Sequence, residues 1–395
     1  MSAGARYQAV VIGAGLSGAV MAERMASQLG WQVLVLEQRP HLGGNCYDEY
    51  DEAGVLVHKY GPHLFHTDKQ HVWDYLSQFT QWRPYEHRVL SQIDGQLLPI
   101  PFNLTSIRQS FAAEKAEAMI EELIRRFGQE ARVPILQLRQ EDNPLLRQLA
   151  EFIYQRAFVN YTSKQWGVGP EAISPAVTAR VPVVVSTDDR YFTDPWQAVP
   201  VDGYSAMIAR MLRQPGIELQ LCTPMASRLR LDLEQATVQL DGKPFAGLLV
   251  YTGMIDQLLP GEAPLPYRSL KFKHQHLNQS QFQPATTVNY PNEEAYTRIT
   301  EFKHLTGQQH AGTSIVYEYP CDYQPEQGLE PYYPIFTDEA QQRYQQYRAR
   351  LAAMPQLLAL GRLAEYRYFD MDDAVDNALE RFDALQQSIF RKDLP

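Results

Sequence analysis

The sequence has few cysteines, no run of basic residues and no long hydrophobic stretch. Its three cysteines, Cys46, Cys222 and Cys321, are widely spaced and contain no CxxC pair, which argues against a disulfide framework and indicates reduced thiols. The net charge of −10 is spread over 395 residues, so we expect neither nucleic acid nor an anionic membrane as a partner. No apolar run approaches the roughly twenty residues of a membrane span. We therefore expect a cytoplasmic protein without a signal peptide.

The sequence also lacks internal repeats and low-complexity linkers. What it has in quantity is apolar residues, which make up 45% of the chain. A chain of this length and composition buries a substantial core, and we expect two or three domains.

The strongest local signal is a glycine-rich turn near the N-terminus. It follows a short apolar run typical of a buried strand, and Gly13, Gly15 and Gly18 have the spacing of a dinucleotide-binding turn. Gly13 permits the tight turn, Gly15 lets a pyrophosphate approach the backbone, and Gly18 lets the following helix pack on the strand. A second apolar strand ends at Glu37, whose carboxylate is suited to an adenosine ribose.

The residues after Glu37 indicate which dinucleotide is bound. Gly43, Gly44 and Asn45 follow at the spacing that flavoproteins use, so the first 45 residues or so resemble the large flavoprotein group that contains the amine oxidases. That resemblance implies bound FAD. The residues expected to contact it are Gly13, Ala14, Gly15, Leu16, Ser17, Gly18, Glu37, Gly43, Gly44 and Asn45.

The strand and helix alternation of the N-terminus does not continue along the chain. Residues 106–161 are predicted to be helical, with Asn143 capping a helix that starts at Pro144. Segments 181–186 and 285–320 are rich in Val, Thr and Tyr and predict an antiparallel sheet. Residues 216–221, 247–253 and 357–362 read as buried strands that return to the nucleotide domain, and a long amphipathic helix follows Asp372.

These segments predict a mixed α/β fold with three domains. A discontinuous Rossmann-like FAD-binding domain carries an inserted helical domain and an antiparallel sheet domain. The boundaries are 1–80 with 199–260 and 355–395 for the FAD-binding domain, 99–176 for the helical domain, and 81–98 with 177–198 and 261–354 for the sheet domain.

The segment 60–67, YGPHLFHT, is rich in histidine and aromatic residues and is predicted to be a loop beside the cofactor. His63 and His66 could bind a metal, but no third ligand is evident and zinc needs three or four donors. We therefore predict no metal site and a role near the flavin for both histidines.

Five segments that follow the flavin fingerprint have to be considered together, because none of their residues is specific alone. They are GPHLFHT, YTSKQWG, YTRITEFKH, PYYPI and GRLAEYRYFDMD, in this order. In this combination they resemble the bacterial UDP-galactopyranose mutases over nearly the whole chain. That family interconverts the pyranose and furanose forms of UDP-galactose, and in it N5 of reduced FAD acts as the nucleophile at the anomeric carbon without net oxidation.

The resemblance implies roles for residues that match the motifs. Arg180 and Arg298 would hold the diphosphate, which suits the bidentate guanidinium group, and Tyr161 would stack on uracil. The implied catalytic residues are Arg180, Arg298 and His66. The implied substrate contacts are Phe158, Tyr161, Thr162, Trp166, Arg180, Tyr191, Asn289, Arg298, Tyr333, Tyr368 and Asp370, and the further flavin contacts are His63, His66, Gly361, Arg362, Asp370 and Met371.

The resemblance also implies an external reductant such as NADPH or NADH, UDP-sugar substrates and a homodimer. The helix after Asp370 would turn its positive end toward reduced flavin, and residues 167–181, which carry Arg180, would form a closing lid. Two other functions remain open: an amine-oxidase-like oxidoreductase, and a non-catalytic flavoprotein that binds UDP-sugars.

Overall fold

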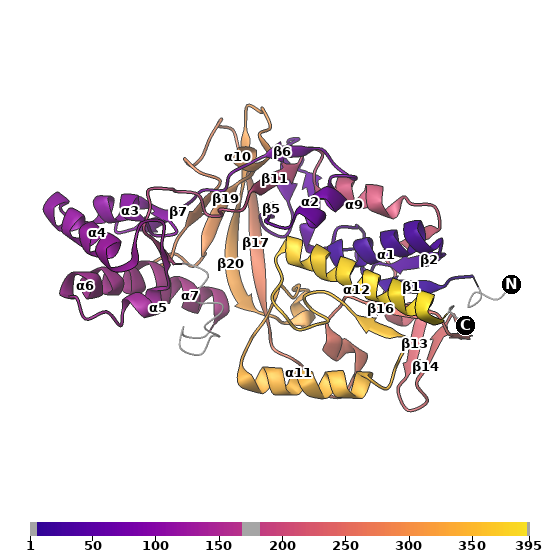
Figure 1. Cartoon of the computed structure of the whole chain (residues 1–395). Helices are drawn as coiled ribbons and strands as arrows, with labels where there is room; N and C mark the ends of the chain where they lie inside the picture. Colours follow the sequence, from indigo (N-terminus) through magenta and orange to yellow (C-terminus); the bar gives the residue numbers. More distant parts are fainter. Residues whose placement is uncertain (1–5, 168–181, 393–395) are drawn as a thin grey trace.

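The computed structural model describes residues 6–167 and 182–392. Figure 1 shows three regions: helices α3 to α7 on one side, a tall sheet in the middle, and a parallel sheet with α1 and α12 on the other side. Both ends of the described chain lie in the last of these regions. Mixed α/β architecture with a Rossmann-like unit was the fold predicted from the sequence, and it is confirmed.

The nucleotide-binding region is built on a five-stranded parallel sheet. Its strand order is β12 (Ile217–Gln220), β2 (Val33–Leu36), β1 (Ala9–Ile12), β16 (Leu248–Tyr251) and β22 (Leu357–Ala359). All four pairings are parallel, with Ala9 opposite both Val33 and Leu248. The predicted strands at 216–221 and 247–253 are thus confirmed. They correspond to β12 and β16, and both lie far along the chain from their partners β2 and β1.

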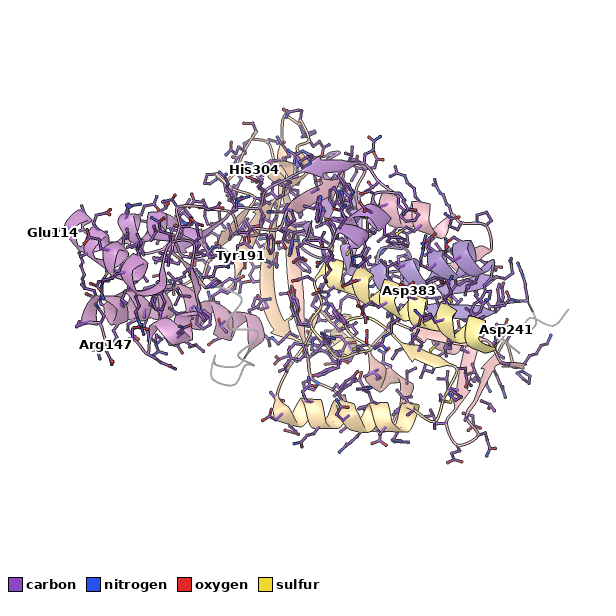
Figure 2. The ribbon with its side chains drawn as sticks, viewed as in Figure 1. Glu114, Arg147, Tyr191, Asp241, His304 and Asp383 are labelled. Atoms are coloured by element: carbon purple, nitrogen blue, oxygen red, sulfur yellow. The ribbon has the colours of Figure 1, made fainter. Side chains whose placement is uncertain are left out.

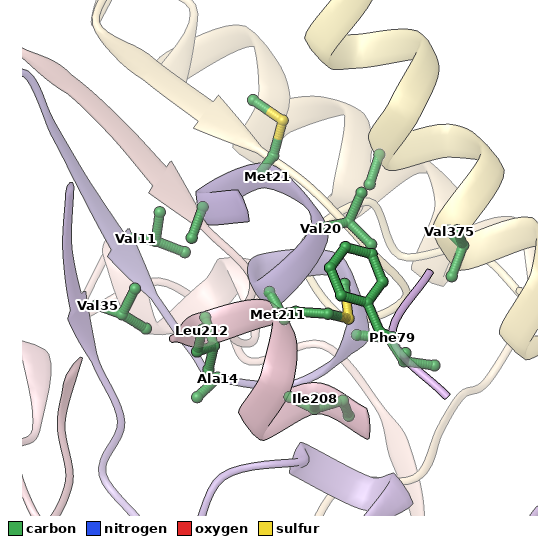
Figure 3. Close-up of a cluster of buried hydrophobic side chains, with 14 of the residues drawn as sticks. Val11, Ala14, Val20, Met21, Val35, Phe79, Ile208, Met211, Leu212 and Val375 are labelled. Carbon is green, nitrogen blue, oxygen red and sulfur yellow. The ribbon is translucent and has the colours of Figure 1, made fainter. Parts of the chain in front are cut away.

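Both faces of this sheet are covered. Val11, Val35 and Val250 face α1 (Leu16–Leu29), α9 (Tyr204–Leu212) and α12 (Met371–Lys392), in the apolar cluster shown in Figure 3. The alternate residues, such as Val10 and Leu34, face the other side, where β13 (Leu229–Asp232), β14 (Thr237–Leu240), β15 (Lys243–Phe245) and α11 (Asp338–Leu351) pack. Strands buried on both faces explain the continuous apolar runs in the sequence.

One predicted strand of this sheet is shorter and less buried than expected. The segment 357–362 was expected to form a buried strand, but β22 covers only three residues and all three are half-buried. Among the described strands it pairs with β16 alone, so its outer edge has no partner strand. Gly361, with φ of 89°, then ends the extended conformation.

The central sheet has seven strands. In spatial order they are β21 (Tyr333–Pro334), β17 (Tyr267–Leu277), β20 (Thr313–Asp322), β19 (Arg298–Glu301), β18 (Thr287–Asn289), β7 (Val89–Ile93) and β8 (Gln96–Ile100). The pairings are antiparallel as predicted, except that β18 runs parallel to β7. Arg298 on β19 lies opposite Asn289 on β18 and opposite Glu318 on β20.

The helical region contains α3 (Leu104–Ser110), α4 (Ala113–Phe127), α5 (Ile135–Leu138), α6 (Pro144–Ile153) and α7 (Val159–Trp166), and a π-helical turn, Tyr154–Phe158, joins α6 to α7. The predicted cap is confirmed, because the Asn143 side chain accepts from the backbone N–H groups of Leu145 and Leu146. The described part of the segment 181–186, residues 182–186, does not join the central sheet as expected. Val183 and Val184 form β10, which pairs with β9 (Arg132–Val133), and Val183 packs among the helices.

The remaining elements are short. They are β3 (Asp48–Tyr50), β4 (Leu56–His58), β5 (Phe65–Thr67), α2 (Gln70–Leu76), β6 (Trp82–Pro84), β11 (Trp196–Pro200) and α10 (Phe302–Thr306). The segment 60–67 was predicted to be a loop throughout, but its last three residues form β5, which pairs with β11. A three-residue strand is too short to show an alternating pattern in the sequence. The domain boundaries given above stay a prediction.

Candidate functional site

A cavity of about 690 Å³ lies where the three regions meet, and its volume is typical of a ligand site. Its walls come from the β1–α1 turn, from β18 and β19, from α7 and from the start of α12. Segments from residue 12 to residue 374 therefore contribute to one site. Tyr191, which lines the cavity and is labelled in Figure 2, lies between the helical region and the central sheet.

The glycine turn forms one end of the cavity. A β-carbon on Gly18 would lie 2.1 Å from the carbonyl oxygen of Gly13, so the turn tolerates no side chain there. Gly15 and Gly44 approach each other so closely that a β-carbon on Gly44 would lie 3.0 Å from the Gly15 α-carbon. Gly15 precedes α1 without a side-chain cap, and the first turn has no acidic residue. The free N–H groups of this helix N-terminus therefore suit a phosphate.

Glu37 stabilises the turn as well as lining the cavity. One carboxylate oxygen accepts from the backbone N–H of Ala14 at 2.8 Å, and the other accepts from the backbone N–H of Arg39 at 2.9 Å. Each oxygen keeps a lone pair for a further donor, such as a ribose hydroxyl. Ala14 itself does not line the cavity, because its N–H is directed to Glu37.

Arg39 lines the same end of the cavity and was not predicted as a site residue. Its Nη2 donates to Asn45 at 3.1 Å and to Glu330 at 2.5 Å, and its guanidinium lies 4.7 Å from the ring centre of Tyr60. Burial alone would lower the pKa of Arg39, but the Glu330 carboxylate raises it by more, so the pKa lies above its usual value. The buried Nη1 has no hydrogen-bond partner among the described residues. A buried donor without a partner is the feature expected where a ligand supplies the acceptor.

His63, in the wall of the cavity, forms a neutral pair with His58, which is buried behind it. His63 directs Nδ1 at the carbonyl of Gly61, 2.9 Å away, and its backbone N–H donates to Nδ1 of His58 at 2.9 Å. Burial lowers the pKa of both His58 and His63 to about 3. Because a carbonyl only accepts, His63 carries its proton on Nδ1 and keeps a lone pair on Nε2.

His66 on β5 is fixed by two neighbours. Its Nδ1 lies 3.1 Å from a carboxylate oxygen of Asp194, and its ring stacks on Phe192 with 3.6 Å between ring centres. This hydrogen bond lowers the pKa of Asp194 despite its burial. His87 also lines the cavity, and its pKa is lowered to about 3 by burial and by the nearby Arg298.

Arg298 and Glu318 form an ion pair beneath the other end of the cavity. Nε of Arg298 lies 2.7 Å from Oε1 of Glu318, whose side chain is fully buried, whereas the Arg298 side chain is 25% exposed. Burial raises the pKa of Glu318, and the guanidinium partly offsets this. Burial alone would lower the pKa of Arg298, but Glu318 outweighs it and the pKa lies above its usual value. Arg298 is therefore a permanent cation in the wall.

Aromatic side chains surround this cation. Tyr161 from α7 lines the cavity, and burial raises its pKa. Tyr333 and Tyr368 stack with an angle of 6° between their rings, and the Arg362 guanidinium lies 5.4 Å from the ring centre of Tyr333. The ring faces of these tyrosines can stack on a planar base, and the guanidinium groups of Arg298 and Arg362 can bind phosphate oxygens.

Comparison with known proteins identifies the family. The model of the UDP-galactopyranose mutase family matches residues 156–368, and that of the NAD(P)-binding Rossmann-like domain matches residues 11–79. The UDP-galactopyranose mutase of Mycoplasma pneumoniae is 35% identical over 390 residues, which cover 97% of each chain. The chain belongs to the UDP-galactopyranose mutase family.

Other relatives show how this mutase family varies. An Escherichia coli dTDP-fucopyranose mutase is 32% identical and covers 94% of this chain and 96% of its own. A solved structure of reduced UDP-galactopyranose mutase has a TM-score of 0.72 at 17% identity, with 96% of both chains covered. A putrescine oxidase variant has a TM-score of 0.55 at 14% identity, covers 97% of this chain and 99% of its own, and shares the fold.

Most residues that the flavin fingerprint and the mutase motifs indicated lie around the one cavity. Those that line it are Gly13, Gly15, Leu16, Ser17, Gly18, Glu37, Gly43, Gly44, Asn45, His63, His66, Tyr161, Tyr191, Asn289, Arg298, Tyr333, Gly361, Arg362, Tyr368, Asp370 and Met371. Ala14, Phe158 and Thr162 do not line it, and Phe158 and Thr162 are buried nearby in the helical region. Arg180 and the expected lid after Gly167 lie outside the described residues, and so does the side chain of Trp166.

Sequence reasoning missed many of the residues that line this cavity, among them the polar or aromatic side chains of Arg39, His87, Gln165 and Phe192. Arg39 could have been found, because a cation two residues after Glu37, the predicted ribose acceptor, is well placed for a dinucleotide. Among the described residues, no cluster of three His, Cys, Asp or Glu side chains could hold a metal ion. None of the described helices combines the length and the apolar character that crossing a bilayer requires.

Proposed function

We propose that this chain interconverts UDP-galactopyranose and UDP-galactofuranose with reduced FAD as its cofactor. The observation that carries the proposal is one cavity that joins a dinucleotide-binding turn to Arg298 and the aromatic residues of the mutase motifs. The first end suits the cofactor, and the second suits a nucleoside diphosphate sugar. An amine substrate would have no use for a permanent cation in the opposite wall.

The residues at the glycine turn fit FAD. The uncapped N-terminus of α1 offers N–H groups to its pyrophosphate, and Glu37 offers acceptors to its adenosine ribose. The unpartnered Nη1 of Arg39 adds a cationic donor to the same end. Among the residues expected to hold FAD are also Asn45, His63 and Met371, all of which line the cavity. Bound in the reduced form, FAD would supply a nucleophile for the anomeric carbon.

The residues of the opposite wall would handle the nucleotide. Arg298 would bind the diphosphate and stabilise the charge that develops as it leaves the sugar, while Tyr161 would stack on uracil. Glu318 would orient the Arg298 guanidinium from below. Arg180 would act as the second diphosphate ligand. Asp194 would keep the proton of His66 on Nδ1, so that the Nε2 lone pair is available to the site.

The other substrate contacts are proposed on the same basis. They are Phe158, Thr162, Trp166, Tyr191, Asn289, Tyr333, Tyr368 and Asp370. Residues 167–181 would close over the nucleotide, so that UDP stays near the sugar while the two are separated. We also propose a cytoplasmic homodimer that receives electrons from NADPH or NADH. Size-exclusion chromatography with light scattering, and anaerobic reduction by each nicotinamide, test these two points.

The proposal is tested by anaerobic incubation of the dithionite-reduced protein with UDP-galactofuranose, followed by chromatography of the sugar nucleotides. Conversion to UDP-galactopyranose by the reduced form, and none by the oxidised form, is expected. Oxygen consumption with simple amines, or UDP binding without conversion, would overturn it. Parallel incubation with the dTDP-fucose pair is needed, because a relative 32% identical is a dTDP-fucopyranose mutase.

A further inference from the structure

The start of α12 forms part of the cavity wall, where Asp370, Met371 and Ala374 line it. A helix N-terminus carries about half a positive charge, which by itself would favour an anionic reduced flavin. The first turn of α12, however, contains Asp372 and Asp373, and Asp376 follows one turn later. Three carboxylates outweigh half a positive charge. The helix alone therefore does not make this end of the cavity positive.

Lys69, which immediately precedes α2, opposes these three carboxylates. Its Nζ lies 2.6 Å from Oδ1 of Asp373, 3.1 Å from Oδ2 of Asp376 and 3.8 Å from Oδ2 of Asp372. The Lys69 side chain is 26% exposed, so water screens the cluster only partly. His71, which is 60% exposed, lies 2.6 Å from Asp376. Among the described residues, Lys69 is thus the cation that contacts all three carboxylates.

The same cluster joins two walls of the cavity. Thr67, at the end of β5, donates to Asp372 at 3.0 Å, and the backbone N–H of Lys69 donates to the Thr67 hydroxyl at 3.0 Å. His66, which lines the cavity, is the residue before Thr67, and Met371, which also lines it, is the residue before Asp372. A change of charge at Lys69 therefore occurs directly behind both walls.

We propose that Lys69 sets the reduction potential of the bound flavin, as the counter-ion of the three carboxylates at the N-terminus of α12. The inference rests on the flavin of the proposed function. Without the ammonium group the three carboxylates lose the cation that contacts all of them, and their charge disfavours the extra negative charge of the reduced flavin. The holoprotein then prefers oxidised FAD more strongly, and its potential falls.

The test compares the midpoint potentials of four holoproteins by dye-coupled anaerobic reduction. Lys69→Met should weaken the preference for reduced over oxidised FAD about tenfold, which corresponds to about 30 mV for a two-electron couple. Lys69→Arg, which keeps the charge, should stay within about threefold of the parent. Asp373→Asn removes a carboxylate and should move the potential in the opposite direction to Lys69→Met.

The sign of the shift in midpoint potential distinguishes an electrostatic role of Lys69 from a purely structural one. A purely structural role would move Lys69→Met and Asp373→Asn in the same direction or leave both potentials unchanged, and either result overturns the inference. If Lys69→Met fails to bind FAD, Asp373→Asn alone decides: a raised potential supports the inference, and an unchanged one overturns it. A parent protein that binds no flavin would instead overturn the proposed function, so the two failures are distinguishable.

Discussion

Replacing Arg298 by alanine should damage this protein in two separable ways. The substitution removes the proposed diphosphate ligand, and it also leaves Glu318 as an unpaired carboxylate with a fully buried side chain. At 2.7 Å and an effective dielectric constant of about 20, the lost attraction is about 6 kcal/mol before the cost of desolvation is counted. Removing one member of a buried ion pair typically lowers the free energy of unfolding by about 3 to 5 kcal/mol.

The matched control is the double variant Arg298→Ala/Glu318→Gln, which removes both charges. Urea unfolding followed by tryptophan fluorescence should show a lower midpoint for Arg298→Ala and recovery of most of the lost stability in the double variant. Turnover should fall about 100-fold to 1000-fold in both, because the diphosphate ligand is absent from both. Equal midpoints for the two variants would refute the ion-pair reasoning. Turnover restored in the double variant would refute the role of Arg298 in diphosphate binding.

Three further outcomes are expected. Burial lowers the pKa values of His58, His63 and His87 to about 3, whereas histidines of the unfolded chain titrate near 6.5. Their contribution to the free energy of unfolding is therefore fully present above about pH 6.5 and is lost as the pH falls toward 3, by about 2 kcal/mol for each histidine between pH 7 and 5. Urea unfolding at several pH values measures this loss. Gly18→Ala should abolish FAD retention in desalting, because its β-carbon meets a backbone carbonyl. Arg39→Met should weaken FAD binding about tenfold in flavin-fluorescence titrations of the apoprotein, through loss of a charged donor.

Each of these outcomes has a control on the same chain. Gln78→Ala, which changes an exposed residue without a titratable group, should leave the pH dependence of unfolding unchanged. Ser27→Ala, on the exposed face of α1, should retain FAD as the parent does. Arg6→Met, at a 63% exposed position, should leave FAD affinity unchanged. If any control behaves like its test variant, the structural reason given for that prediction is contradicted.

The parts of the fold that the sequence predicted well are those governed by local interactions. The glycine turn and the Asn143 cap depend on neighbours a few residues away, and the buried strands are recognisable from their own apolar runs, although their partners are distant in the sequence. Predictions failed where distant pairing decides the structure. Val183 resembles a sheet residue by composition, yet it pairs with β9 beside the helices. The short β5 exists because β11 supplies its partner.

The candidate site shows the same division. Arg298 is recognisable from its motif, but its pairing with Glu318 depends on the register of β19 against β20, which no local pattern reports. Lys69 and Asp376 lie about 300 residues apart in the sequence and meet only because α2 packs against α12. The sequence predicted which residue types the cavity uses. It could not predict which buried charged side chains form ion pairs with those residues, such as Glu318 with Arg298.

The order of strands in the parallel sheet has a consequence for how the protein is made. The sheet takes its strands from residues 9 to 359, and α12 covers one face only afterwards. A ribosome that adds about 5 to 20 residues per second needs roughly 20 to 80 s to add these 395 residues. During that time the emerging N-terminal strands lack β16, β22 and α12. The nascent polypeptide therefore cannot assemble the complete cavity until residue 374 has left the ribosome, so a ligand that needs every wall can bind only after that point.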